Sequence, residues 1–323
     1  MKKLFILCLA AGFLAVAWAM PASAADTSCK TKYPIILAHG MGFISTEVYP
    51  NSFPGIVEAL RARGATVYIT NVESLGATRE KAEQFKTGFL QIKATDGSAK
   101  FNIMGHSHGG LYTRDAITNL GLAPNVASLT TVDSPHRGSV LAGVMNLINN
   151  VAPMIGNLIA GFIPFPGDQS KLAINIQQLT PNYMNNTFNP NCPNAAGVYY
   201  QSWTGQYKVY NLFSTTAHFL IMLVQALTGT SSTPSTPQEY VAAFNKVLPD
   251  LATEIFFLGG GFNDGLVPVN SAKWGTFLGV QSGNWFTKGV NHIDVVNLSP
   301  NGAPFDVVGY WVKVVQNLKN KGY

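Results

Sequence analysis

The chain has 323 residues, of which 11% are charged and 47% apolar, and its formal net charge is +5 at pH 7. Lys2 and Lys3 belong to an N-terminal leader, and without them 19 basic residues stand against 16 acidic ones. An excess this small, with no cluster of Lys or Arg, argues against binding to nucleic acid. Few charges and many apolar residues fit a protein that works at an apolar surface.

Residues 1–24 have the pattern of a secretory signal peptide. Lys2 and Lys3 precede an apolar run over 4–19, and Ala22-Ser23-Ala24 supplies the small residues of a cleavage site. The alternative is an uncleaved membrane anchor, but the run is short for a span and a cleavage pattern follows it. We therefore expect a secreted protein whose mature part, 25–323, is long enough for one large α/β domain.

Export also bears on the three cysteines. Cys8 lies in the leader, so Cys29 and Cys192 are the only two in the mature part. In an oxidising compartment they could form a disulfide that ties the mature N-terminus to a distant loop. Such a bond would contribute about 4–5 kcal/mol of stability in the chain-entropy model. We expect this disulfide, and the alternative is two free thiols.

Apolar, strand-like runs alternate with helical patterns over the first 140 residues. Nearly continuous apolar strands separated by helices indicate a parallel sheet covered on both faces, which is an α/β fold. Ligands of such folds lie at the carboxyl ends of the strands. Strands are expected at 34–38, 66–72, 101–104, 126–132 and 254–259, and helices at 54–63, 79–93 and 110–117.

The alternation breaks between about residues 140 and 250. Apolar runs at 140–165 and 217–227 flank a segment rich in Tyr, Asn and Pro. We expect this region to be an insertion above the strand ends, a helical lid whose apolar underside turns outward at a lipid surface. The alternative is that its apolar runs are ordinary core helices. No internal repeat or shift in composition indicates a second domain.

The segment Gly105-His106-Ser107-His108-Gly109 fits a turn that exposes a catalytic serine. It follows the strand at 101–104 and precedes the helix at 110–117, which is the setting of the nucleophile elbow of α/β-hydrolases. The two glycines leave room for neighbouring backbone. The serine would adopt a strained conformation that projects its hydroxyl from the sheet. Ser107 is therefore the candidate nucleophile.

A serine hydroxyl needs a histidine to remove its proton and a carboxylate to orient that histidine. In α/β-hydrolases the chain order is serine, acid, histidine. His292, in a loop before the last helix, is the histidine in the required place. Asp264 is the favoured acid because glycines flank it in the loop 261–268. Asp133, directly after the strand at 126–132, is the alternative, because some hydrolases carry the acid there.

An oxyanion hole needs two backbone N–H groups that point at the developing negative charge. One is expected from His108, the residue after the nucleophile. The other is expected from Met41 in the loop 39–43, where Gly40 and Gly42 permit a close approach. The alternative for this loop is an ordinary glycine turn.

Five motifs in this order make the chain resemble the bacterial true lipases, the secreted triacylglycerol lipases of the Pseudomonas, Burkholderia and Proteus type. The resemblance covers residues 32–140 and about 254–298. It implies an α/β-hydrolase fold, hydrolysis of lipid esters at an oil–water interface, and a triad of Ser107, Asp264 and His292. The motifs are Lys32–Met41, Gly105–Gly110, Ser134–Ser139, Asn263–Val267 and Asn291–Asn297.

The resemblance also implies a structural calcium ion near the histidine loop. Asp294 matches one carboxylate ligand of the family, and the backbone carbonyls of Leu298 and Gly302 would supply two more. The second carboxylate has no counterpart in the comparable segment 211–218. Calcium prefers several oxygen ligands, carboxylates among them, so the alternative is that Asp294 only braces its loop. Several members of the family also need a membrane-tethered foldase as a partner.

The expected activity is therefore that of a secreted lipase with an acyl-enzyme mechanism. A short-chain carboxylesterase and a polyester depolymerase are alternatives, because both would use the same triad. A third alternative, from another class of function, is a catalytically silent hydrolase-fold protein that only binds lipid. The complete set of serine, acid and histidine argues against it.

Overall fold

A computed structural model describes the chain over residues 25–41, 52–143, 146, 171–207, 260–283, 289–299 and 302–323. The expected signal peptide, the apolar run at 217–227, the strand at 254–259 and most of the run at 140–165 lie outside the described residues. Across the described ranges, no helix combines the length and the apolar character that a membrane span needs.

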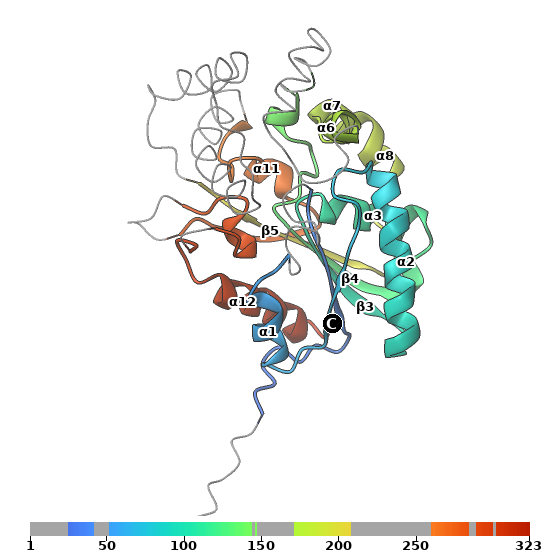
Figure 1. The fold of residues 1–323 in the computed structure, drawn as a ribbon, viewed down its shortest axis with the longest axis vertical. Coiled ribbons are helices and arrows are strands. Elements are labelled where there is room, and N and C mark those ends of the chain that lie inside the picture. Colours follow the sequence, from blue (N-terminus) through green and yellow to red (C-terminus); the bar gives the residue numbers. More distant parts are fainter. Residues whose placement is uncertain are drawn as a thin grey trace, which may run out of the picture.

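Six parallel strands form one sheet at the centre of the molecule (Figure 1), in the order β2-β1-β3-β4-β5-β6. The expected α/β class is therefore confirmed. The four strands expected in the first 140 residues are present with ends shifted by no more than two residues. The strands are β1 (Ile35–Ala38), β2 (Val67–Thr70), β3 (Phe101–His106), β4 (Val126–Val132), β5 (Tyr199–Gly205) and β6 (Thr276–Gln281).

Helices cover both faces of the sheet (Figure 1). Alternate residues of β1 point to opposite faces, as the pleat requires. Ile35 and Leu37 pack in one apolar cluster with α1 (Ile56–Arg61) and α12 (Val307–Asn320). Ile36 and Ala38 belong to a second cluster, shared with α2 (Thr78–Asp96) and α3 (Gly109–Asn119). The described short helices are η1 (Ala123–Asn125), α6 (Leu172–Gln178), α7 (Pro181–Tyr183), η3 (Met184–Phe188), α8 (Asn189–Asn191), α11 (Val269–Ala272) and η5 (Asp294–Val296).

Strand β5 corrects the expected insertion at 140–250. It lies within the sheet, between β4 and β6, so the chain returns to the core at residue 199 and the region is not one continuous insertion. Its side chains are buried but largely polar: Gln201, for example, donates from Nε2 to Thr130 Oγ1 at 2.9 Å. A strand of this kind is stabilised by paired polar groups as well as by apolar burial.

The two ends of the described chain meet at the amino ends of the strands. The Lys32 N–H donates to the carbonyl of Tyr323 at 2.8 Å, three residues before β1 begins. The Lys319 ammonium donates to the carbonyl of Thr27 at 2.7 Å. The first described residues and the last helix are thus joined on the side of the sheet away from the strand ends that carry Ser107.

The expected disulfide between Cys29 and Cys192 is wrong, because both cysteines are free and buried. Cys29 packs in the cluster of α1 and α12, whereas Cys192 packs with Leu111 and Met184 beside α3. The two thiols pack in separate apolar clusters, and no disulfide joins them. Burial raises the pKa of both thiols, which keeps them protonated.

Candidate active site

The turn after β3 has the conformation expected of a nucleophile elbow. Ser107 adopts a left-handed backbone with a φ of 55°, and its N–H donates to the carbonyl of Val132 at 2.9 Å. A Cβ added at Gly109 would lie 2.3 Å from the carbonyl oxygen of Ala38, and one at Gly105 would lie 2.6 Å from the N–H nitrogen at the start of α3. Only glycine fits at either position, because the backbones of β1, β3 and α3 converge there.

His292 connects the serine to a carboxylate. Its Nε2 lies 2.8 Å from Ser107 Oγ, and its Nδ1 lies 2.7 Å from Asp264 Oδ2. A carboxylate accepts, so Nδ1 carries the proton and Nε2 is left to accept the proton of the serine hydroxyl. The structure therefore brings together the three side chains expected to form the triad, and it favours Asp264 over Asp133 as the partner of the histidine.

The loop around Asp264 holds its carboxylate in a fixed orientation. Oδ1 accepts from the N–H groups of Leu266 at 2.9 Å and Val267 at 2.7 Å, which leaves Oδ2 for the histidine. The N–H of His292 also donates to the backbone carbonyl of Asp264 at 2.9 Å. The acid loop and the histidine loop are thus joined through both backbone and side chain.

The electrostatic surroundings of His292 favour its charged form. Burial alone would lower the pKa of this histidine, but the charge of Asp264 and its hydrogen bond outweigh burial, so the pKa lies above the usual 6.5. The second histidine in the site, His106, donates from Nε2 to the carbonyl of His292 at 2.9 Å. Burial keeps the pKa of His106 well below its usual value, so His106 stays neutral.

Asp133 lies at the end of β4, beside the triad but outside its chain of hydrogen bonds. Its Oδ1 accepts from Thr204 Oγ1 at 2.7 Å and from the N–H of Gly205 at 2.5 Å. Burial and the nearby charge of Asp264 raise the pKa of Asp133 to about 8. At neutral pH this carboxyl is therefore mostly protonated, unlike a carboxylate that orients a catalytic histidine.

The loop after β1 lies directly against the nucleophile. A Cβ at Gly40 would lie 2.8 Å from the Cβ of Ser107. His39 fixes this loop: its Nδ1 donates to the carbonyl of Gly40 at 2.8 Å, and its Nε2 accepts from the N–H of Val72 at 3.2 Å. Burial lowers the pKa of His39 to about 4, which preserves that neutral tautomer. Met41, the expected oxyanion donor, follows immediately, and residues 42–43 of the loop lie outside the described residues.

The other expected donor, His108, is held by side chains that the sequence analysis did not single out. Its Nδ1 lies 3.3 Å from Lys81 Nζ and 3.5 Å from Asn175 Nδ2, and its Nε2 lies 2.9 Å from Thr78 Oγ1. Because the amide nitrogen of Asn175 can only donate, Nδ1 accepts and Nε2 donates to the threonine. Lys81 also donates to the carbonyl of Ser74 at 2.7 Å, and burial lowers the pKa of Lys81 to about 7. Helices α2 and α6 thereby fix the residue after the nucleophile.

The motif Ser134–Ser139 has a structural role, because its side chains contact several elements around the site. Arg114, from α3, donates to His136 Nδ1 at 3.2 Å, and its guanidinium lies 3.6 Å from the centre of the Trp274 ring. Ser139 Oγ donates to the carbonyl of Leu266 at 2.7 Å. The motif thus connects the chain after β4 to α3 and to the loop 261–268, and so helps to hold the backbone around Asp264 in place.

Asp294, the expected carboxylate ligand of calcium, is hydrogen-bonded within its own loop. Its Oδ1 accepts a hydrogen bond from Ser299 Oγ, and its Oδ2 accepts from the N–H of Asn291 at 2.9 Å. Both carboxylate oxygens are therefore used inside the loop. In the described ranges, the one cluster of three His, Cys, Asp or Glu side chains close enough to share a metal is His106, Asp133 and His292. Calcium takes 6–8 oxygens, and among the expected ligands Asp294, Leu298 and Gly302 only Asp294 brings a carboxylate, so the calcium ion remains a prediction from the family resemblance.

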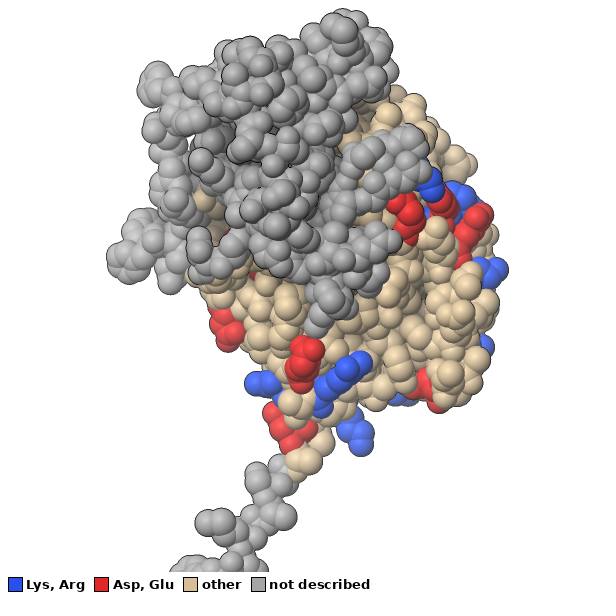
Figure 2. All heavy atoms as spheres, viewed as in Figure 1, with Lys and Arg blue, Asp and Glu red and all other residues tan. Residues whose placement is uncertain are grey.

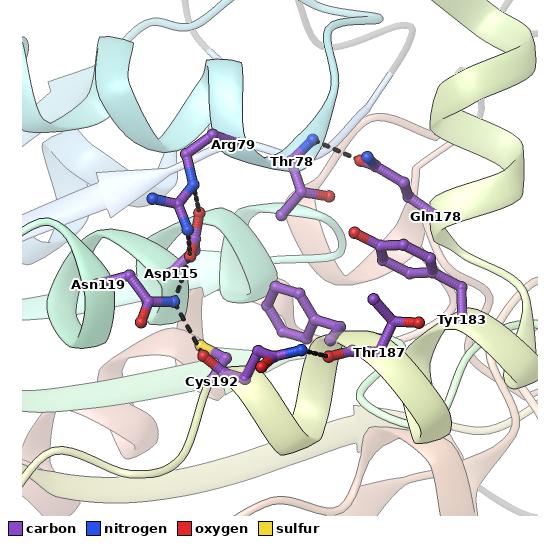
Figure 3. Close-up of a pocket in the computed structure, with 10 residues that line it drawn as sticks. Thr78, Arg79, Asp115, Asn119, Gln178, Tyr183, Thr187 and Cys192 are labelled. Carbon is purple, nitrogen blue, oxygen red and sulfur yellow. Dashed lines mark hydrogen bonds and ion pairs between the residues drawn. The ribbon is translucent and has the colours of Figure 1, made fainter.

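A pocket lies beside the site, between α2, α3 and the segment from α6 to α8 (Figure 3). It encloses about 190 Å³. Arg79 and Asp115 form an ion pair at 2.8 Å on one wall, and Gln178 accepts from the N–H of Thr78 at 2.7 Å on another. Ser107, Asp264 and His292 do not line this pocket. It is therefore separate from the position where a reacting ester would lie.

The parallel sheet, the elbow at its carboxyl edge and the linked serine, histidine and aspartate define an α/β-hydrolase. Comparisons with known proteins agree. The sequence model of the family described as palmitoyl protein thioesterase matches residues 34–276. The chain is 30% identical to a triacylglycerol lipase of Burkholderia plantarii over 88% of this chain and 84% of that protein. It is 28% identical to triacylglycerol lipase 2 of Saccharomyces cerevisiae over 83% of this chain and 73% of that protein.

The chain therefore belongs to the α/β-hydrolase family that this model describes, together with the bacterial triacylglycerol lipases that it resembles. The expected relationship to bacterial lipases is confirmed. Solved structures share the fold: a mature lipase of Bacillus licheniformis superposes with a TM-score of 0.58 at 14% identity, covering 88% of this chain and 92% of that one. A metagenomic carboxyl esterase gives a TM-score of 0.58 at 15% identity, covering 93% of this chain and 77% of that one.

Proposed function

We propose that the protein is a lipase that hydrolyses the carboxylic esters of acylglycerols through an acyl-enzyme. The observation that carries this proposal is the unbroken chain of hydrogen bonds from Asp264 through His292 to Ser107, at 2.7 Å and 2.8 Å. This arrangement supplies a nucleophile, a base and an orienting acid in the order that serine hydrolysis requires.

The mechanism follows from these positions. His292 Nε2 takes the proton of Ser107 as the serine oxygen attacks the ester carbonyl, and Asp264 stabilises the resulting imidazolium. The histidine then gives that proton to the departing alcohol, and the serine retains the acyl group. Water, deprotonated by the same nitrogen, attacks the acyl-enzyme, and the fatty acid leaves as the serine recovers its proton.

The negative charge on the carbonyl oxygen is met by two backbone N–H groups, those of Met41 and His108. Two observations support these roles. The loop of Met41 lies against the serine at Gly40, and His108 begins the turn into α3 with its side chain held from two other helices. Fixed donors of this kind stabilise the transition state because they need no reorganisation during the reaction.

The substrate class rests on the relatives. Those from Burkholderia plantarii and Saccharomyces cerevisiae are triacylglycerol lipases by name. The scarcity of charge also suits work at an oil–water interface: on the face in Figure 2, Lys, Arg, Asp and Glu stand in small groups of mixed sign between large uncharged areas. The carboxyl esterase among the similar structures makes a short-chain esterase the second candidate.

Export is part of the proposal. The leader over 1–24 would deliver the chain from 25 onward to the exterior, where a lipid interface is accessible. The helical lid expected from the apolar runs after residue 140 would then cover the site in water and open at the interface. From the resemblance to the bacterial true lipases we also propose a membrane-tethered foldase as a folding partner; refolding of pure protein without any partner would contradict this.

The test uses purified protein and two substrates. A serine-directed fluorophosphonate should label the wild-type protein but not Ser107→Ala, and this variant should lose at least about 10³-fold in turnover with an unchanged melting temperature. Retained hydrolysis by Ser107→Ala would contradict the proposal. Butyrate and long-chain esters, assayed below and above their solubility limits, separate the two candidates: a rise in rate on emulsions favours a lipase, and a preference for dissolved butyrate favours an esterase.

A further inference from the structure

A second carboxyl lies beside the histidine of the triad and takes no part in the mechanism above. Asp133 is fully buried, and its Oδ2 has no hydrogen-bond partner among the described residues. One atom each of Asp133, His106 and His292 that could bind a metal lie within 4.8 Å of one another. A buried carboxyl oxygen without a partner is unusual, because a buried polar atom ordinarily pairs.

The backbone places Asp133 there at a cost. Its φ of 52° is left-handed, a conformation that a residue with a Cβ rarely adopts. Its Oδ1 braces β5 through Thr204 and Gly205, but an asparagine would accept those two hydrogen bonds equally well. The brace therefore accounts for one side-chain oxygen and leaves the other, together with the ionisable group, without an explanation.

The groups that face Asp133 determine its charge. Asp264 repels a negative charge on it and His292 attracts one, while burial favours its neutral form. His106 lies beside Asp133, and its Nδ1 has no hydrogen-bond partner in the described parts of the chain. A charge on Asp133 would also raise the pKa of Tyr310 in α12. Because two adjacent carboxylates cannot easily both ionise in a buried site, Asp133 carries a proton while Asp264 is charged.

From this arrangement, which rests on the proposed triad, we propose that Asp133 is a second carboxyl partner of His292. It is silent while Asp264 is charged, and it becomes the counter-ion of the histidine when the charge of Asp264 is lost. On this view Asp133 is a positioning residue that acts through the histidine, and His292 has two carboxyl partners, one at the end of β4 and one in the loop 261–268.

The consequence is a dependence on background that bracing alone would not produce. With Asp264 in place, Asp133 is neutral at pH 7, and Asp133→Asn replaces one neutral acceptor with another. With Asp264→Asn, the repulsion disappears, Asp133 ionises at lower pH, and its charge stabilises the imidazolium that forms as Ser107 attacks. Loss of a triad aspartate costs about 10⁴-fold in turnover where no other acid stands by, so we expect Asp264→Asn to lose only about 10²-fold.

The experiment is a double-mutant cycle on the mature chain. The kcat/KM for dissolved p-nitrophenyl butyrate at pH 7 is measured for wild type, Asp133→Asn, Asp264→Asn and the double variant, with melting temperatures for each. We expect Asp133→Asn to cost less than about 3-fold alone and at least about 10-fold in the Asp264→Asn background. Equal costs in both backgrounds would overturn the proposal, because a purely structural role acts independently of Asp264.

Two further measurements protect the conclusion. Asp264→Ala is the second background, because the amide of Asn could hold the histidine in the wrong tautomer, and the same 10-fold dependence on Asp133 is expected there. In the Asp264→Asn and Asp264→Ala backgrounds, kcat/KM should rise with pH as Asp133 ionises. This rise should be absent when Asp133→Asn is added. If Ser107→Ala and His292→Ala keep activity, the proposed function fails; if both are inactive and the cycle is additive, only the role of Asp133 fails.

Discussion

Ser107 and Asp133 end neighbouring strands in the same left-handed conformation, with φ values of 55° and 52°. The strands β3 and β4 are in register up to His106 and Val132, so the two residues leave the sheet side by side. Each turn directs a polar side chain to the same edge of the sheet, toward His292. The candidate active site is thus built on a pair of matched strand ends rather than on the elbow alone.

The raised pKa of His292 predicts the acid limb of the activity profile. The imidazole must be neutral to accept the serine proton, so kcat/KM should rise with pH through a midpoint above the usual 6.5 of histidine. Asp264→Asn together with Asp133→Asn removes both carboxylate charges that raise this pKa, so the midpoint of the double variant should move to lower pH. Initial rates on a dissolved ester between pH 5 and 9 measure both curves. A midpoint that does not move in the double variant would show that neither carboxyl acts on the titrating group.

The buried Lys81 should matter for the rate more than for substrate binding. Lys81→Met leaves His108 Nδ1 with the 3.5 Å contact from Asn175 alone, which loosens the residue whose N–H meets the oxyanion. We expect kcat to fall by about 10-fold with little change in KM, less than the about 10²–10³ that follows direct loss of a donor. Lys86→Met, on the same helix, is the matched control and should retain its activity. A change in KM alone would contradict this role.

Gly109 is predicted to be irreplaceable. An alanine there would place its Cβ 2.3 Å from the carbonyl oxygen of Ala38, and the strand or the helix would have to move. We expect Gly109→Ala to lower the free energy of unfolding by about 2–3 kcal/mol and to remove most activity. Gly88 lies in the middle of α2, and a Cβ added there would lie 3.4 Å from the nearest side chain. Gly88→Ala should therefore change the free energy of unfolding by less than about 1 kcal/mol. Urea unfolding of both variants checks the difference, and equal losses would contradict it.

Chelation is predicted to leave the fold intact. Asp294 uses both carboxylate oxygens within its own loop, so we expect this loop to hold without an ion and EDTA to shift the melting temperature by less than about 1 °C. The variant Asp294→Asn should still melt at lower temperature, because one of its donors would face an amide nitrogen. A fall in melting temperature with EDTA that added calcium reverses would instead establish the metal site implied by the family.

The cysteines offer a chemical test of the packing. Both thiols are free and buried, so the native mature chain should react slowly with an aromatic disulfide reagent and the urea-unfolded chain should release the equivalent of both thiols. Reducing agent should leave the melting temperature unchanged. An unfolded chain without reactive thiols, together with a lower melting temperature in reductant, would show that Cys29 and Cys192 are paired after all.

The first half of the fold was open to prediction because its strands are apolar and its turns carry glycine. β4 was expected at the residues where it lies, and the elbow was identified from the setting of Ser107 between a strand and a helix. β5 and β6 have no recognisable strand pattern in the sequence, for physical reasons. The buried side chains of β5 include Gln201, Ser202 and Thr204, which pair with neighbours instead of forming an apolar run. β6 lies at the edge of the sheet, where its residues are half-buried or exposed.

The candidate site divides in the same way. The order of serine, acid and histidine identified residues that the structure brings together, but their supports have no signature in the chain. Lys81 lies among other charged residues of an amphipathic helix, where a lysine ordinarily faces water, and only the fold shows that it is buried against His108. The prediction of a disulfide between Cys29 and Cys192 was wrong for a related reason. Cysteine number and compartment make a bond plausible, but only three-dimensional proximity makes it possible.

The hydrogen bond between the Lys32 N–H and the Tyr323 carbonyl has a practical consequence. Tyr323 lies on the side of the sheet opposite the strand ends that carry Ser107, so a tag, a surface linker or a fused domain attached after residue 323 would leave the candidate active site facing outward. An immobilised form anchored there should therefore meet an oil droplet with the same orientation in every copy.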